Sequence, residues 1–168
     1  MLEIDGSGGG DPRDLMARLN AARAELRAAI AGLTPVQMDT GQVLPGYTAK
    51  DLLGIIAAWD HEALAALEAF GYGDTRYRVE IGNIAEWNAQ ARDRRRPLAP
   101  MQVQMDCLMV RGEIVSLLTL MPPHLFDQEI EYPWDERGTV RHLVEATMIA
   151  NDRQNAAAIR EWRRREGL

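Results

Sequence analysis

The chain has 168 residues and a formal net charge of −6; 46% of its residues are hydrophobic and 26% are charged. This length and balance are typical of one globular domain with a substantial core. The acidic charge argues against a nucleic-acid partner, and no apolar run approaches the ~20 residues that span a membrane. A single cysteine, Cys107, excludes an internal disulfide. Without a recognisable secretory signal, the sequence suggests a cytoplasmic protein.

Residues 1–10 differ in composition from the rest of the chain. The run Gly6-Ser7-Gly8-Gly9-Gly10 is typical of a flexible linker. It could be natural or introduced artificially, and it carries no fold signal. We therefore assign residues 1–10 to a flexible leader and residues 11–168 to a single domain.

Apolar residues at spacings of three and four predict helices over residues 11–33, 49–70, 83–95, 100–120 and 138–165. Asp11 before Pro12, and Thr48 followed by Asp51, are typical helix starts. Residues 76–81 alternate like a short strand but have no evident partner, so we expect a loop there. The pattern predicts an all-α four-helix bundle with one additional short helix and connections long enough for crossovers.

The last predicted helix carries two asparagines where its inward stripe should be apolar. Heptad counting gives the stripe as Val140, Val144, Thr147, Asn151, Asn155, Ala158 and Trp162, widened by Leu143, Met148 and Ile159. A buried amide left without a partner costs about 1–3 kcal/mol. Asn151 and Asn155 are therefore expected to bond each other, a water or a neighbouring backbone, or to form the polar floor of a pocket; the remaining alternative is that both side chains are exposed.

A methionine stripe and a glycine mark the helix predicted over residues 100–120. Met101, Met105 and Met109 are four apart, and Gly112 follows on the same strip. Methionine usually fills a core, but it also suits surfaces that accept irregular partners. Glycine within a helix costs about 1 kcal/mol relative to alanine, so Gly112 suggests that another backbone or a ligand approaches closely.

Three patches of the chain follow one another in a distinctive order. The first begins Tyr47-Thr48-Ala49-Lys50-Asp51 and ends at Trp59, and the second is Ile84-Ala85-Glu86-Trp87-Asn88-Ala89-Gln90. The third runs from Thr139-Val140-Arg141-His142-Leu143 to Asn151-Asp152-Arg153-Gln154-Asn155 and Ile159. Together they resemble the DinB/YfiT-like superfamily of four-helix bundles, and its ClbS-like branch in particular. The resemblance spans about residues 11–165 and implies a DinB-like four-helix bundle.

The resemblance also implies where a metal would lie. In that family three histidines, one from the second helix and two from the last, hold a divalent metal. The corresponding positions here are Ile55, Asn151 and Asn155. Isoleucine cannot ligate, and an amide oxygen is a poor ligand for zinc or nickel. The spacing of the three histidines, His61, His124 and His142, does not suggest a replacement site, so we expect no metal and no cofactor.

We interpret the chain as a metal-free, non-catalytic bundle with an apolar small-molecule pocket. Its floor would be Ile55, Asn151 and Asn155, and its wall would comprise Trp59, Met105, Met109, Gly112 and Met148. The coordinated substitutions and the glycine-rich leader suggest a redesigned natural scaffold. One alternative is a metal-dependent hydrolase or thiol transferase, as in the family. Another is a module that presents a helix face to a partner protein or to a second copy as a homodimer.

Overall fold

The structure, a computed structural model, describes residues 10–73, 81–132, 134 and 136–168. The predicted leader and most of the predicted loop over residues 76–81 lie outside the described residues. Within them no helix is both long and apolar enough to cross a membrane.

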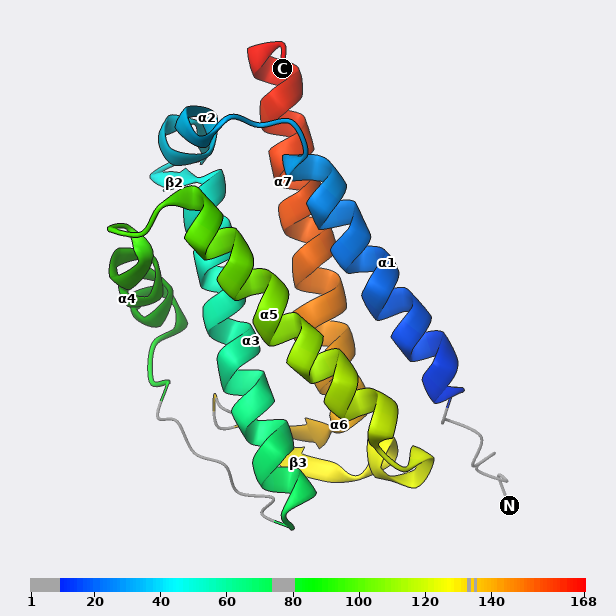
Figure 1. The fold of residues 1–168 in the computed structure, drawn as a ribbon. Helices are drawn as coiled ribbons and strands as arrows, with labels where there is room; N and C mark the ends of the chain where they lie inside the picture. The colour runs from blue at the N-terminus through cyan, green and yellow to red at the C-terminus, as the bar shows by residue number, and fades with distance from the viewer. Residues whose placement is uncertain (1–9, 74–80, 133, 135) are drawn as a thin grey trace, which may run out of the picture.

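Four long helices form the bundle, as predicted. They are α1 (Pro12–Ile30), α3 (Ala49–Gly71), α5 (Pro100–Leu120) and α7 (Ala150–Glu166). The additional predicted helix is α4 (Ile84–Arg95), which packs on the outside of α3 (Figure 1). The all-α bundle prediction is confirmed.

The helices do not simply alternate in direction. In Figure 1, α1 and α7 run toward one end of the bundle, whereas α3 and α5 run toward the other. The main packing pairs are α3 with α5 and α1 with α7, so each close pair is parallel. Parallel neighbours require a long connection, and the segment that holds α4 returns the chain from the end of α3 to the start of α5. The predicted crossover is therefore present.

Local chemistry explains where the long helices begin. The Asp11 side chain accepts a hydrogen bond from the backbone N–H of Arg13, at 2.9 Å, and Pro12 occupies the first helical turn. Thr48 and Asp51 form the predicted capping box, in which each side chain accepts from the other residue's backbone N–H. These bonds satisfy donors that a helix N-terminus otherwise leaves open.

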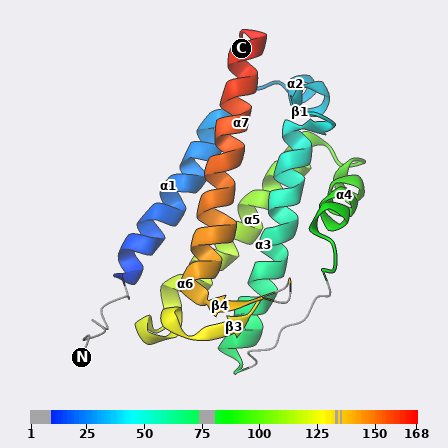
Figure 2. The same ribbon diagram turned by 180° about the vertical axis from the view of Figure 1, so that it is seen from behind.

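The connections contain more structure than the sequence predicts. The segment after α1 holds α2 (Pro35–Thr40) and a pair of antiparallel strands, β1 (Gln42–Leu44) and β2 (Tyr47–Thr48). The segment after α5 holds a 3-10 turn, η1 (Pro123–Asp127), and a second antiparallel pair, β3 (Glu129–Glu131) and β4 (Arg137–Thr139). Figure 2 shows this second pair at the end of the bundle where α6 (Val140–Leu143) begins. Strands of two or three residues are too short to give a periodic signal.

The helix predicted over residues 138–165 changes its winding near its start. After α6, residues Val144–Ile149 form a π-helical segment, η2, before α7. A π turn holds more residues than an α turn, so it rotates the face that follows. Met148 and Ile159 are buried as predicted, but Asp152 and Ala156 are buried in place of the predicted Thr147, Asn151, Asn155 and Ala158. The predicted stripe is wrong by one residue here, and both asparagines are only half-buried.

The apolar core consists of two clusters at opposite ends of the bundle. One is built around Leu15, Leu19, Leu67, Ile114, Phe126 and Leu143. The other is built around Leu26, Leu53, Ile56, Val103, Ile159 and Trp162. Between them, each long helix contributes a buried charged residue instead of an apolar one.

Candidate functional site

Four charged side chains, one from each long helix, form a buried ionic layer that we define as Arg23, Asp60, Arg111 and Asp152. Arg23 donates to Oδ2 of Asp60 from Nη2 and to Oδ2 of Asp152 from Nε, both at 2.9 Å. Arg111 bonds both oxygens of Asp60, at 2.7 and 3.1 Å, and donates to Asp152 at 2.9 Å. Two cations and two anions balance, so the layer is formally neutral.

Asp152 is the most enclosed member of the ionic layer, with 0% of its surface exposed. Among the described residues, none donates a hydrogen bond to its Oδ1 atom. Burial raises the pKa of this carboxyl, although Arg111 and Arg23 act in the opposite direction. The layer is therefore held by one oxygen of Asp152 and both oxygens of Asp60.

Cys107 borders the ionic layer from α5. Arg23 donates from Nη1 to its Sγ atom, at 2.7 Å, and to its carbonyl oxygen, at 3.3 Å. Burial raises the pKa of the thiol to about 11 despite the nearby arginines. A thiol that stays protonated near neutral pH is a weak nucleophile.

A hollow of about 250 Å³ lies between α3, the π segment and α7, and we call it the tryptophan hollow. It is lined by Trp59, Ile84, Trp134, Ala146, Thr147, Ala150, Asn151 and Gln154. The π segment supplies Ala146 and Thr147, and π segments often occur at functional sites. None of the lining residues carries an ionisable side chain.

Aromatic contacts hold the wall of the tryptophan hollow in place. The Trp59 ring lies 4.3 Å from that of Trp87 and 5.6 Å from that of Trp134, between ring centroids. The indole N–H of Trp59 donates to Oδ1 of Asn88 at 2.8 Å, which ties α3 to α4. Trp134 in turn packs on Tyr132, at 4.9 Å. Trp59 is thus held in place by three neighbouring side chains, those of Trp87, Trp134 and Asn88.

Gly138 leaves space for the ring of Tyr132, which packs on Trp134. Tyr132 donates from its hydroxyl to the carbonyl oxygen of Thr139, at 2.8 Å, across the β3–β4 pair. A Cβ atom at Gly138 would lie only 2.2 Å from that hydroxyl oxygen. Burial raises the pKa of Tyr132 to about 12, so its hydroxyl remains a donor over the usual pH range.

The two asparagines from the sequence prediction bond each other. Asn155 donates from Nδ2 to Oδ1 of Asn151, at 2.7 Å, and to its backbone carbonyl, at 2.9 Å. Asn151 lines the tryptophan hollow, whereas Asn155 and Ile55 are half-buried and lie outside its lining. The structure therefore joins Asn151 to Trp59 but does not place the whole predicted floor around one hollow.

These three positions do not fit the metal that the family resemblance implies. The Ile55 side chain has no donor atom, and the oxygen of Asn151 already accepts from Asn155. Within the described parts of the chain, no three His, Cys, Asp or Glu side chains are grouped so that they could hold a metal ion. His61 instead contacts Asp106 of α5, at 2.7 Å.

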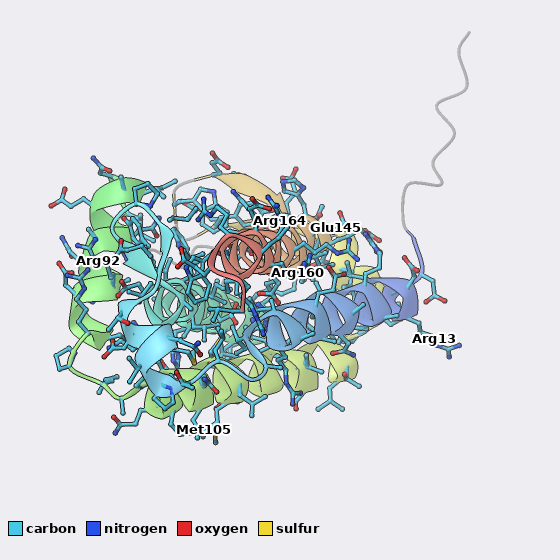
Figure 3. The ribbon with its side chains drawn as sticks, turned by 90° about the horizontal axis from the view of Figure 1, so that it is seen from above. Arg13, Arg92, Met105, Glu145, Arg160 and Arg164 are labelled. Atoms are coloured by element: carbon cyan, nitrogen blue, oxygen red, sulfur yellow. The ribbon has the colours of Figure 1, made fainter. Side chains whose placement is uncertain are left out.

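The predicted methionine wall is not at the tryptophan hollow. Figure 3 shows Met105 at the outer edge of α5, and Met109 is 59% exposed. Met109 and Gly112 border a separate shallow depression, and Met148 is buried in the core. The reason is that α5 buries its other face, which carries Val103, Cys107, Val110, Arg111, Ile114 and Leu118. Nothing lies within 4 Å of a Cβ added at Gly112, so no backbone of this chain approaches closely there within the described residues, and a close ligand stays a prediction.

Sequence reasoning missed the ionic layer, although the signal was available. Arg23 falls on the inward face of α1, between Ala22 and Leu26, and Asp152 directly follows Asn151. A charged residue on an apolar stripe predicts a buried partner, because an unpaired buried charge is too costly. The unpredicted π segment concealed the signal at Asp152.

Comparison with known proteins rests on structure, since no family model and no curated protein matches the sequence. YfiT from Bacillus subtilis, described as a probable metal-dependent hydrolase with an unusual four-helix bundle topology, has a TM-score of 0.72 and 17% identity over 93% of this chain and 87% of its own. The colibactin self-resistance protein ClbS, solved in complex with a dsDNA, has a TM-score of 0.78 and 10% identity over 94% and 98% of the two chains. An uncharacterised protein from Escherichia coli UTI89 has a TM-score of 0.79 and 11% identity over 94% and 95%. The chain therefore has the DinB/YfiT-like four-helix bundle fold.

Proposed function

We propose that the protein is a binding module for a small, uncharged, planar molecule in the tryptophan hollow. The observation that carries this proposal is the lining: two indole rings, Trp59 and Trp134, stand beside the polar groups of Thr147, Asn151 and Gln154. Aromatic walls with a few polar groups are usual in small-molecule sites. No charged side chain lines the hollow, so an ionic ligand would lose its hydration without gaining a counter-charge.

The same lining supports binding more than catalysis. Amides are poor acids and bases near neutral pH, and the Thr147 hydroxyl donates to the carbonyl of Leu143. YfiT is described as a probable metal-dependent hydrolase, but the donor set at Ile55, Asn151 and Asn155 does not suit that chemistry. We therefore do not assign hydrolysis to this chain.

The test uses uncharged planar probes, indole and benzamide, with the carboxylate benzoate as a charged comparison. Melting temperature should rise with indole or benzamide concentration, since a ligand that binds only the folded state stabilises it. The emission of Trp59 and Trp134 should change over the same concentrations. Benzoate should have a weaker effect.

Variants make the test specific. Asn151→Ala should weaken benzamide binding several-fold, because one amide partner is lost. Asn20→Ala, which changes an exposed asparagine on α1, is the matched control and should bind benzamide as the parent does. Equal binding by both variants, or no saturable response to either uncharged probe, would refute the proposal.

A second candidate function, self-association through α5, is favoured by one observation. Met101, Met105, Leu108 and Met109 are 67%, 45%, 47% and 59% exposed, and they form an uncharged strip. Such patches often mark interaction sites. Because two copies of a chain with net charge −6 repel each other elsewhere, this strip is where a second copy would meet it. Light scattering across a concentration series should detect a dimer that Met109→Lys abolishes, and a concentration-independent monomer would exclude it.

A further inference from the structure

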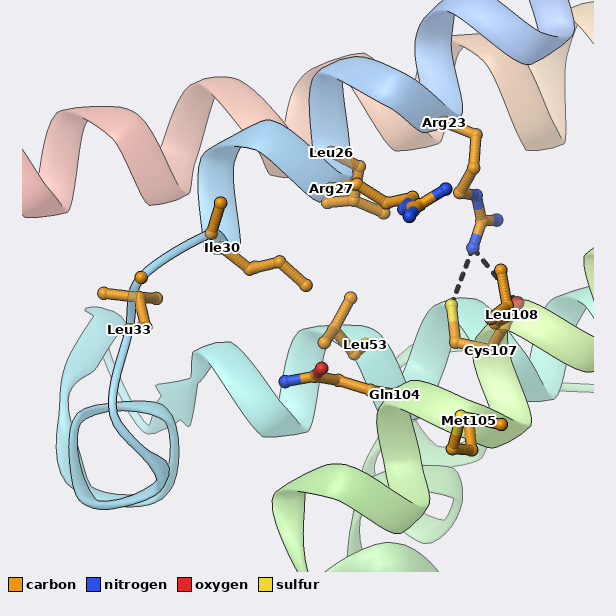
Figure 4. A pocket seen from close by; sticks show the side chains of 12 residues that line it. Arg23, Leu26, Arg27, Ile30, Leu33, Leu53, Gln104, Met105, Cys107 and Leu108 are labelled. Atoms are coloured by element: carbon orange, nitrogen blue, oxygen red, sulfur yellow. Dashed lines mark hydrogen bonds between the residues drawn. The ribbon is translucent and has the colours of Figure 1, made fainter.

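A second hollow, of about 300 Å³, lies between the C-terminal half of α1 and the N-terminal half of α5 (Figure 4). We call it the arginine hollow. Its apolar lining comprises Leu26, Ile30, Ala31, Leu33, Leu53, Met105 and Leu108. Its volume is at the lower end of the range of sites for small organic ligands. It is separate from the tryptophan hollow, because the two share no lining residue.

The charged groups of the arginine hollow are all positive. Arg23 and Arg27 line it from successive turns of α1, and the lining includes no aspartate or glutamate. Arg23 is neutralised by Asp60 and Asp152 within the ionic layer. Arg27 is exposed, and no ion pair joins it to an acid within the described residues. Arg27 therefore gives the hollow an uncompensated positive charge.

The end of α1 does not cancel this charge. A helix C-terminus is electronegative because its last carbonyl oxygens lack helical partners. Here Arg163 of α7 donates from Nη1 to the carbonyl oxygens of Ala29 and Ala31, at 2.9 and 2.8 Å. The Gln104 amide on the α5 side adds a neutral polar group, which donates to the sulfur of Met38.

From this combination of an apolar wall and an unpaired guanidinium, we propose that the arginine hollow binds a small amphipathic carboxylate. The aliphatic part of the ligand lies against Leu26, Leu53 and Leu108, and its carboxylate pairs with Arg27. Guanidinium and carboxylate match in geometry and can form two parallel hydrogen bonds. A neutral ligand of the same shape gains the apolar contacts only.

Octanoate and its neutral analogue octanol are the probes, and calorimetry measures their affinity below the concentrations at which they aggregate. Octanoate should bind saturably at one site and more tightly than octanol, and added salt should reduce the difference. Arg27→Gln should weaken octanoate about fivefold, as expected for a partly exposed ion pair, and leave octanol unchanged. Arg13→Gln, which changes an exposed arginine at the other end of α1, is the matched control and should change neither affinity.

Location is tested with methyl-labelled methionine. Octanoate should shift the NMR signal of Met105, which lines the arginine hollow, but not that of Met109, which lies on the exposed face one turn later. Asn151→Ala should not alter octanoate binding, which separates this site from the tryptophan hollow. Equal affinities for octanoate and octanol, no effect of Arg27→Gln, or shifts at Met109 but not Met105 would overturn the proposal.

Discussion

Asn155 donates a hydrogen bond to Asn151 at the two positions where the family resemblance implies metal-binding histidines. The amide of Asn155 donates to the side-chain oxygen of Asn151 at 2.7 Å, one turn earlier on α7. Asn151 also lines the tryptophan hollow. The two positions thus carry amides, which do not suit zinc or nickel as ligands.

Histidines placed at the three positions that the family resemblance implies should create a metal site. Ile55→His, Asn151→His and Asn155→His together supply three imidazoles, the number that a catalytic zinc site uses. The triple variant should take up one zinc per chain, as measured by elemental analysis after dialysis. The double variant that retains Ile55 should bind zinc more weakly. No uptake by a folded triple variant would mean that the three positions do not converge.

Breaking the ionic layer should strongly destabilise the fold. Arg111→Met removes three hydrogen bonds and leaves Asp60 and Asp152 with only Arg23. Removing one partner of a buried ion pair typically costs about 3–5 kcal/mol. Urea unfolding should show a loss of that order. Arg153→Met, which breaks the exposed pair with Glu25, is the control and should cost less than about 1 kcal/mol.

Stability should fall at alkaline pH because of Cys107. Its pKa rises from 9.0 to about 11 on folding, so above pH 9 the unfolded chain loses the thiol proton before the folded chain does. Unfolding is therefore favoured as pH rises from about 9 to 11, by on the order of 2–3 kcal/mol at the upper end. Urea midpoints across this range should show the decline, and Cys107→Ala should lack this part of it. An identical decline in both proteins would contradict the assignment.

Two glycine substitutions should act in opposite directions. Gly138→Ala places a methyl group 2.2 Å from the Tyr132 hydroxyl, so the aromatic group must move, at a cost of about 1–3 kcal/mol. Gly112→Ala meets nothing within 4 Å in the middle of α5 and should stabilise the protein by about 0.5–1 kcal/mol. Thermal unfolding measures both. A destabilised Gly112→Ala variant would show that another molecule covers this face.

The sequence was sufficient for the bundle but not for the register of its last helix. The apolar stripes on α1, α3 and α5 repeat over many turns, so an error in assigning one residue to the buried face does not change the helix prediction. The π segment at Val144–Ile149 interrupts the last stripe within a single turn and has no distinctive composition. It moves Asp152 into the core and Asn151 to the edge of a hollow. The outward position of Met105 and Met109 could not be predicted either, because Val103 and Cys107 offer an equally apolar inward face.

The position of the ionic layer, midway along α1, α3 and α5 and in the first turn of α7, has a consequence for how the bundle assembles. If one helix slid by a single turn, about 5.4 Å, its charged residue would enter an apolar cluster and its former partners would lose their counter-ion. Apolar contacts alone would tolerate such an axial shift. The ion pairs among Arg23, Asp60, Arg111 and Asp152 form in one register of the helices. These ion pairs therefore fix the axial position of each helix relative to its neighbours. The same positions determine where the tryptophan hollow and the arginine hollow lie.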